Sequence, residues 1–369
     1  MNLRWIFLTA FVFGSSAFAG SLQLQLDDGV FHPGQDQIHI DNGVYKVPCN
    51  CGHNSQTQDF RKLLIPANII GPEDGRDNIT NLRTTLGMSS KEFPGIVSQV
   101  RASTGFVACK GSQPKPACVV PDDPKAQPYI DNSIPPRPNP GYASAALVGN
   151  NMQIATNSHV FYDECGQERT PLSDCYFLNQ ADPPSKNIAL DFSSAKLGAH
   201  GLIDPLDRND FAVVRLTSPV PGAKPFAIDS SLLKGDPNKS TKGDTVVAIS
   251  SFQDVPNKSI DAKIPVAQSC NIRQTNPALA DGSPSDYYSD CDVQPHASGG
   301  IVLARKGKNG PFVIKALIAA SGKSYLNGHE YDPSVFSMTR MVVFDGNFMS
   351  AVTDMKNSTP KVDGLISTP

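Results

Sequence analysis

The sequence predicts an all-β fold, either a barrel or a sandwich, on three observations. From Ile69 onward, short apolar runs alternate with turns rich in glycine, proline, asparagine and aspartate. The 29 glycines and 31 prolines are scattered along the chain, which excludes a collagen-like repeat and favours a loop-rich β fold. No amphipathic pattern of helical length precedes residue 344. With 39% apolar and 18% charged residues, the chain of 369 residues can bury a substantial core.

The first nineteen residues have the pattern of a secretory signal peptide. Arg4 supplies the positive charge, residues 5–13 form the apolar run, and Ala17-Phe18-Ala19 matches the small-residue cleavage motif. A membrane-spanning helix needs about 20 apolar residues, roughly twice this run. We therefore expect cleavage after Ala19, no membrane anchor in the mature chain, and a secreted or periplasmic protein.

The remaining chain divides by composition and pattern. Residues 20–66 are polar and irregular, which indicates an N-terminal extension or propeptide, and residues 111–141 are proline-rich without periodicity, which indicates a long surface loop. Gly149-Asn150 is a hairpin-turn signal. Residues 344–355 are ambiguous and are the candidate for a terminal helix. Strands are expected at 95–100, 145–148, 152–155, 211–216, 245–249, 300–303 and 312–318.

Eight cysteines in an exported chain indicate four disulfides. Short sequence separations favour the pairs Cys109–Cys118, Cys165–Cys175 and Cys270–Cys291. Cys49 and Cys51 remain, and they either form a strained bridge or bind a metal together with His53. Because no second ligand cluster lies at zinc spacing, we expect no metal site.

The net charge of −3 and the absence of a lysine or arginine cluster give no electrostatic footprint for a nucleic acid. We therefore expect no nucleic-acid partner.

Three segments carry candidate chemistry. His159 lies at the end of an apolar strand, Asp210 directly precedes another, and Ser298 lies in a turn followed by two glycines and a third strand. A serine hydroxyl is a poor nucleophile until an imidazole takes its proton, and the imidazole needs a carboxylate to fix its tautomer. The three residue types occur in the order His, Asp, Ser, which is one of the known orders of a catalytic triad.

These segments together resemble the trypsin/chymotrypsin superfamily of serine peptidases, whose motifs read T-A-A-H-C, D-I-A-L-L and G-D-S-G-G-P. The chain looks like the bacterial V8-like (glutamyl endopeptidase) branch, because residues 69–80 resemble the start of its mature domain and residues 289–298 its D-C-D-T-x-P-G-S-S element. The resemblance covers residues 67–355, which leaves residues 356–369 as a C-terminal tail. It implies two packed six-stranded antiparallel β-barrels with the site between them.

By position, the resemblance implies that His159 is the general base, Asp210 its orienting partner and Ser298 the nucleophile of an exported serine endopeptidase. The backbone N–H groups of His296 and Ser298 would form the oxyanion hole. Protein or peptide substrates are the implied partners, and no cofactor is implied.

Three departures from the family motifs bear on activity. Val160 replaces the cysteine after the histidine, and Ala297 replaces the aspartate with which a new N-terminal amine pairs during trypsin activation. His296 replaces the oxyanion-hole glycine, and its Cβ narrows the allowed backbone conformations. Losing one donor costs about 10²–10³ in rate. The alternative is therefore a catalytically silent homologue that binds proteins or peptides.

The sequence indicates the substrate specificity less clearly than the catalytic residues. The strand at 313–322 has no histidine where the glutamyl branch uses one, so a glutamate preference does not carry over. Asp292 lies six residues before Ser298, the offset of trypsin's basic-specificity aspartate, and it is either a selector of basic residues or a turn or surface aspartate. We expect Ala319, Ala320 and Ser321 to run alongside the substrate backbone as an edge strand.

Overall fold

The computed structural model describes most of the chain after residue 74. The described ranges are 25–26, 29–30, 39–41, 44–46, 75–109, 115–119, 129–134, 142–163, 165–181, 187–198, 209–235, 243–251, 264–275, 286–293, 296–307, 310–321 and 339–357. Four short strands nearer the N-terminus pair as two ribbons: β1 (Gln25–Leu26) with β2 (Gly29–Val30), and β3 (His39–Asp41) with β4 (Val44–Lys46). The predicted signal peptide, Cys49, Cys51 and residues 358–369 lie outside the described residues.

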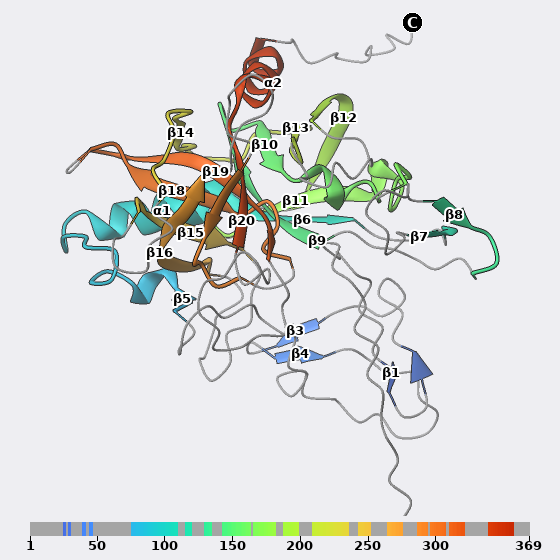
Figure 1. Ribbon diagram of the computed structural model, residues 1–369, viewed down its shortest axis with the longest axis horizontal. Helices are drawn as coiled ribbons and strands as arrows, with labels where there is room; N and C mark the ends of the chain where they lie inside the picture. The colour runs from blue at the N-terminus through green and yellow to red at the C-terminus, as the bar shows by residue number, and fades with distance from the viewer. Residues whose placement is uncertain are drawn as a thin grey trace, which may run out of the picture.

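The first barrel closes on itself with six antiparallel strands (Figure 1). Around the barrel the order is β10-β13-β12-β11-β6-β9. The strands are β6 (Thr104–Cys109), β9 (Tyr142–Leu147), β10 (Gln153–Thr156), β11 (Cys175–Asn179), β12 (Ile188–Leu197) and β13 (Ala212–Leu216).

The second barrel also has six antiparallel strands, because β19 pairs with both β18 and β20 and so closes the order β19-β18-β15-β16-β17-β20. The strands are β15 (Thr245–Ser250), β16 (Val266–Thr275), β17 (Asp286–Ser289), β18 (Ile301–Arg305), β19 (Phe312–Ser321) and β20 (Thr339–Val343). Two outer strands are added, β14 (Ala227–Ile228) on β19 and β5 (Asp77–Asn78) on β16. The predicted two-barrel fold is confirmed.

The alternation of side chains along β13 explains why the barrels pack together. Ala212, Val214 and Leu216 belong to the core of the first barrel, whereas Val213 belongs to the cluster between the barrels. Both faces of this strand are therefore buried, and its one charged residue, Arg215, is buried with its guanidinium donating to the Met355 carbonyl at 2.7 Å. Ile249 of β15 joins the same inter-barrel cluster from the other side.

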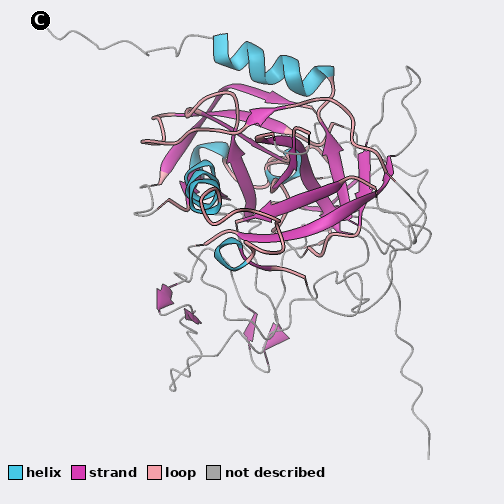
Figure 2. Cartoon of the chain, turned by 90° about the vertical axis from the view of Figure 1, so that its left-hand side faces the viewer, coloured by secondary structure: helices cyan, strands magenta, loops and turns pink. Residues whose placement is uncertain are grey.

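The C-terminal helix expected at 344–355 is present as α2 (Gly346–Asn357). Phe348, Ala351, Val352 and Met355 are its buried residues, at the spacing of one helix face. Figure 2 shows α2 lying outside the strands on one side of the molecule. Within the described residues, no helix has the length and hydropathy required to cross a bilayer.

Two local predictions are wrong. The stretch predicted as a strand at 95–100 lies in helix α1 (Phe93–Ser103). Pro94 is tolerated in the first turn of a helix, and Ile96, Val97 and Val100 pack at helical spacing, although β-branched residues after Pro-Gly are typical of a strand. The loop expected at 111–141 contains a hairpin, β7 (Ala117–Val119) with β8 (Tyr129–Asp131), whose three-residue strands are too short to give an alternating signal.

The disulfides correct two of the predicted pairs. Cys270–Cys291 is confirmed, but the other pairs are Cys109–Cys175 and Cys118–Cys165. Cys109 and Cys175 lie directly opposite each other on β6 and β11, so the strand register and not the sequence separation sets this pair. Cys118 then joins the hairpin to the loop that follows His159.

Candidate active site

His159 is positioned by the end of β10. After Thr156 the strand passes through Asn157 into a single 3-10 turn at Ser158–Val160. Val160 and Phe161 are buried and fix this turn in the core of the first barrel, while the side chain of His159 remains partly exposed. The turn therefore presents the imidazole at the surface between the barrels.

Asp210 reaches His159 because β10 and β13 are antiparallel neighbours, with Thr156 opposite Ala212. Asp210 as a whole residue is 5% exposed. Its Oδ2 lies 2.6 Å from His159 Nδ1, and its Oδ1 accepts hydrogen bonds from the His159 N–H at 3.1 Å and the Ser158 hydroxyl at 2.8 Å. The Asn157 amide also donates to the Asp210 carbonyl, at 2.6 Å.

Asp210 is held in its ionised form. Burial on its own would raise the pKa of this carboxyl, but the neighbouring His159 charge and the hydrogen bonds from His159 and Ser158 lower it to about 2. An ionised carboxylate beside Nδ1 fixes the proton of the neutral imidazole on that nitrogen. Nε2 then carries the lone pair, which is the state required of a general base.

Ser158 is the contributor that the sequence analysis did not find. Its hydroxyl is buried and donates to the carboxylate of Asp210. A polar residue directly before His159 was the only signal in the sequence, and serine in that place is ordinary for a turn.

Ser298 lies in a loop that fits against the first barrel. Gly299 has φ +79°, and a Cβ on it would lie 2.1 Å from the Ser144 carbonyl and 2.2 Å from Thr156 Oγ1. Only glycine satisfies both the backbone angle and this close approach. The loop therefore brings Ser298 to the end of β10, three residues before His159.

The Ser298 hydroxyl donates to the carbonyl oxygen of Ala319, at 3.1 Å. A hydroxyl has one proton to give, so this proton must turn away from Ala319 before it can pass to His159. Catalytic hydrogen bonds are often completed only when substrate binds.

His296 has φ +76°, in the left-handed region that favours glycine. The Ser144 N–H and hydroxyl both donate to its carbonyl, at 3.0 and 3.1 Å, and the Gly300 N–H donates to the next carbonyl, that of Ala297, at 2.8 Å. The histidine therefore adopts the backbone conformation that a glycine would adopt here. Within the described part of the chain, the Ser298 N–H has no acceptor, so it is available to a bound oxyanion.

The imidazole of His296 is held by Tyr142. Its Nδ1 lies 3.1 Å from the Tyr142 carbonyl oxygen. Burial lowers the pKa of His296, and the hydrogen bond to Tyr142 partly opposes this effect. The ring is therefore uncharged at neutral pH.

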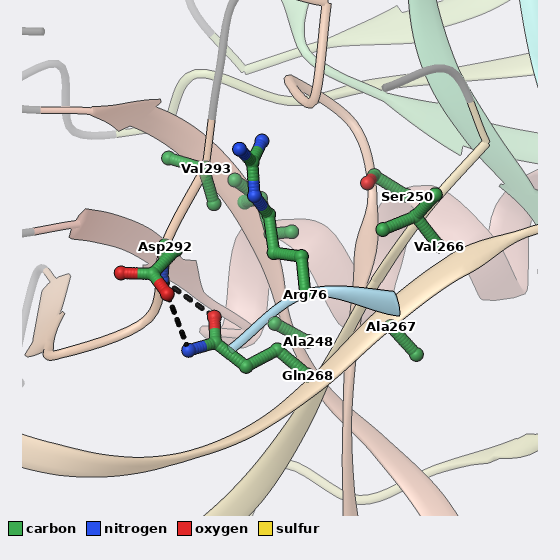
Figure 3. A pocket seen from close by; sticks show the side chains of 9 residues that line it. Arg76, Ala248, Ser250, Val266, Ala267, Gln268, Asp292 and Val293 are labelled. Carbon is green, nitrogen blue, oxygen red and sulfur yellow. Dashed lines mark hydrogen bonds between the residues drawn. The ribbon is translucent and has the colours of Figure 1, made fainter. Parts of the chain in front are cut away.

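Asp292 lies in a tightly packed pocket that Arg76, Gln268 and Val293 also line (Figure 3). It is 2% exposed, so the expectation of a surface aspartate is wrong. Its Oδ2 accepts hydrogen bonds from the Gly75 N–H at 2.8 Å and the Gln268 amide at 2.9 Å, and its own N–H donates to Gln268 Oε1 at 2.6 Å. The carboxylate thereby joins the start of the described domain to the second barrel. Selection of basic residues by Asp292 stays a prediction to which this geometry adds nothing.

The edge of β19 is open beside Ser298. Backbone pairing along this side of β19 ends at Ile318, whose N–H donates to the Gly300 carbonyl and whose carbonyl accepts from the Gly299 N–H, both at 2.8 Å. Among the described strands none continues along that side of Ala319. The Ala319 carbonyl points to Ser298. This is the geometry expected of a strand edge that takes up a peptide backbone.

Cys118, Cys165 and Asp163 are the described residues whose ligand atoms come close enough to hold a metal. The two sulfurs form a disulfide and so are not thiolate ligands. Asp163 instead accepts the N–H groups of Cys165 and Gln167, at 3.0 and 2.9 Å. These three residues therefore hold the loop in place through a disulfide and hydrogen bonds and do not form a metal site.

No family model and no curated protein sequence matches the chain. Solved structures similar to it include a Glu endopeptidase in complex with MPD, at 11% identity and a TM-score of 0.45 over 79% of this chain and 100% of that one. Others are a scabies mite inactivated protease paralogue (11%, 0.43, 71% and 98%) and a thermostable serine protease from an extremophilic microorganism (15%, 0.41, 70% and 99%). Identities and TM-scores this low leave the activity to be inferred from the chain's own residues.

Proposed function

We propose that this protein is an exported serine endopeptidase in which Ser298 is the nucleophile, His159 the general base and Asp210 its orienting carboxylate. The observation that carries the proposal is the buried, ionised Asp210 bonded to His159 Nδ1. The glycine-dependent packing of the Ser298 loop against β10 supports it, because this packing brings the serine to the same strand end. The three disulfides support an oxidising compartment outside the cytoplasm.

The chemistry follows from these positions. A peptide pairs with the open edge of β19, and its carbonyl carbon meets Ser298 Oγ. His159 Nε2 takes the hydroxyl proton as the Oγ–C bond forms, and the N–H groups of His296 and Ser298 bind the oxyanion. His159 then protonates the leaving amine, and a water molecule activated by the same imidazole hydrolyses the acyl-enzyme.

The experiment is to incubate the protein with a defined mixture of peptides and to identify the products by mass spectrometry. We expect cleavage by the wild type and by Ser350→Ala, which removes an exposed serine from α2, and no cleavage by Ser298→Ala. Equal product formation by Ser298→Ala would refute the proposal.

The second candidate is a silent homologue that binds peptides without cleaving them. His296 in a left-handed conformation favours it, since a strained residue stands at the oxyanion hole. Binding of peptides by folded wild-type protein without any product would support this alternative.

A further inference from the structure

A row of side chains crosses the outer face of the first barrel next to the candidate site. Tyr142 of β9 lies opposite Ala108 of β6, and Ala108 lies opposite Tyr176 of β11. Side chains of directly paired residues lie on one face of a sheet. The neighbouring row consists of Val107, Ala143 and Phe177, whose side chains point into the core of the first barrel. Tyr142, Ala108 and Tyr176 therefore point outward, because successive residues of a strand face opposite sides of the sheet.

The two tyrosines stand on either side of the small Ala108 in this row. Burial raises the pKa of Tyr142, and the nearby Tyr176 hydroxyl raises it further. His296 then extends the row into residues 296–300, the loop that carries Ser298 and is here called the nucleophile loop. Its ring meets Tyr142 edge-on, at 6.4 Å between centroids and 89° between planes.

This surface is both apolar and accessible. Tyr142 is 37% exposed, and Tyr176 and His296 are partly exposed. Because burial lowers the pKa of His296, the surface carries no charge near neutral pH. Its chemistry therefore suits an uncharged aromatic or large aliphatic group.

The position of the surface relative to Ser298 identifies its occupant. The nucleophile loop bridges the barrels, since Ser298 bonds to Ala319 of β19 while the His296 carbonyl is held by Ser144 of β9. A peptide whose acyl side follows β19 has its scissile carbonyl at Ser298. Its leaving side then continues past His296 to the start of β9, where Tyr142 lies.

We propose that Tyr142, Tyr176 and His296, here called the aromatic shelf, bind the side chain of the first or second residue on the leaving side of the scissile bond. The shelf selects aromatic or large aliphatic residues at that position. This inference rests on the proposed function. It adds a determinant of specificity for the leaving side of the substrate, separate from the residues of β19 that would bind the acyl side.

The test uses a synthetic peptide mixture with all amino acids equally represented on both sides of the bond. Cleavage sites are read by mass spectrometry, and preference is expressed as a ratio within each sample, so a change in overall rate does not affect it. In the wild type we expect aromatic and large aliphatic residues to be enriched on the leaving side about two- to tenfold, the size of one aromatic contact. Tyr142→Ala should remove this enrichment, and Tyr142→Phe should keep it.

Leu232→Ala is the matched control, because Leu232 is an exposed apolar residue of the loop after β14. It should leave the profile unchanged. Thermal melting verifies that each variant is folded; if Tyr142→Ala is not, Tyr176→Ala is expected to reduce the same enrichment.

Labelling of Ser298 by a fluorophosphonate separates the two proposals. A labelled, cleaving wild type with a flat leaving-side profile, or a profile that survives both Tyr142→Ala and Tyr176→Ala, overturns the shelf and leaves the peptidase standing. A folded wild type that neither labels nor cleaves overturns both.

Discussion

At the scale of single residues, the environment of Asp210 determines the chemistry of the site. Its carboxylate accepts three hydrogen bonds from Ser158 and His159, and its carbonyl accepts a fourth from Asn157. Four donors on three consecutive residues fix the distance between the carboxylate and the imidazole. Such a buried charge is stable only because each oxygen is satisfied.

Removing the Ser158 hydroxyl should weaken this arrangement without removing any member of the triad. Because a hydrogen bond to a charged group contributes about 1.5–3 kcal/mol, we expect kcat for peptide cleavage to fall about 10- to 100-fold in Ser158→Ala, with KM little changed. Ser158→Thr retains a hydroxyl and should recover most of the loss. A wild-type kcat in Ser158→Ala, or a loss confined to KM, would contradict this role.

The low pKa of Asp210 also predicts how stability depends on pH. The pKa is about 2 in the folded protein against an ordinary value of 3.8 for an aspartate, so the folded state favours the ionised form. Its contribution is fully present above about pH 4 and is lost as the pH falls through 2. We expect it to amount to about 2 kcal/mol.

Urea unfolding at pH 5 and at pH 2 measures this contribution. Between the two pH values, the wild type should lose about 2 kcal/mol more of its free energy of unfolding than Asp210→Asn, which has no titrating carboxyl at this position. Parallel losses in both proteins would show that Asp210 does not have a depressed pKa.

At the scale of elements, the nucleophile loop depends on close backbone contact with the first barrel. Gly299 and Gly222 both have positive φ, at +79° and +68°, but only Gly299 has backbone and side-chain atoms where a Cβ would stand. The pair therefore separates the cost of the backbone angle from the cost of the clash.

We expect Gly222→Ala to lower the free energy of unfolding by about 1–2 kcal/mol and Gly299→Ala by about 3–5 kcal/mol, with loss of peptide cleavage only in the latter. Denaturant unfolding and the peptide assay measure the two quantities. Equal destabilisation by the two substitutions would contradict the tight fit of the loop.

Sequence pattern predicted the strands next to His159, Asp210 and Ser298, because each is a short, mainly apolar run bounded by turn residues. It failed for α1, where Ile96 and Val97 favour a strand locally and only packing of the helix face on the core decides otherwise. The left-handed conformation of His296 was not predicted, because a Cβ makes it less favourable than for glycine; in the structure, hydrogen bonds from Ser144 hold the His296 carbonyl.

At the scale of the whole molecule, the two barrels act together because the site belongs to neither alone. His159 and Asp210 come from the first barrel, whereas Ser298 precedes β18 and bonds to β19 of the second. The pairing of Cys109 with Cys175 and the burial of Asp292 are also consequences of the assembled fold. They depend on which strands become neighbours, which separations along the chain do not reveal.

The nucleophile is tested most directly by finding which residue reacts with a fluorophosphonate, by mass spectrometry of peptides from the labelled protein. We expect one adduct, on Ser298, absent in Ser298→Ala, formed far more slowly in His159→Ala and unchanged in Ser350→Ala. An adduct on another serine, or equal labelling in Ser298→Ala, would contradict the assignment of the nucleophile.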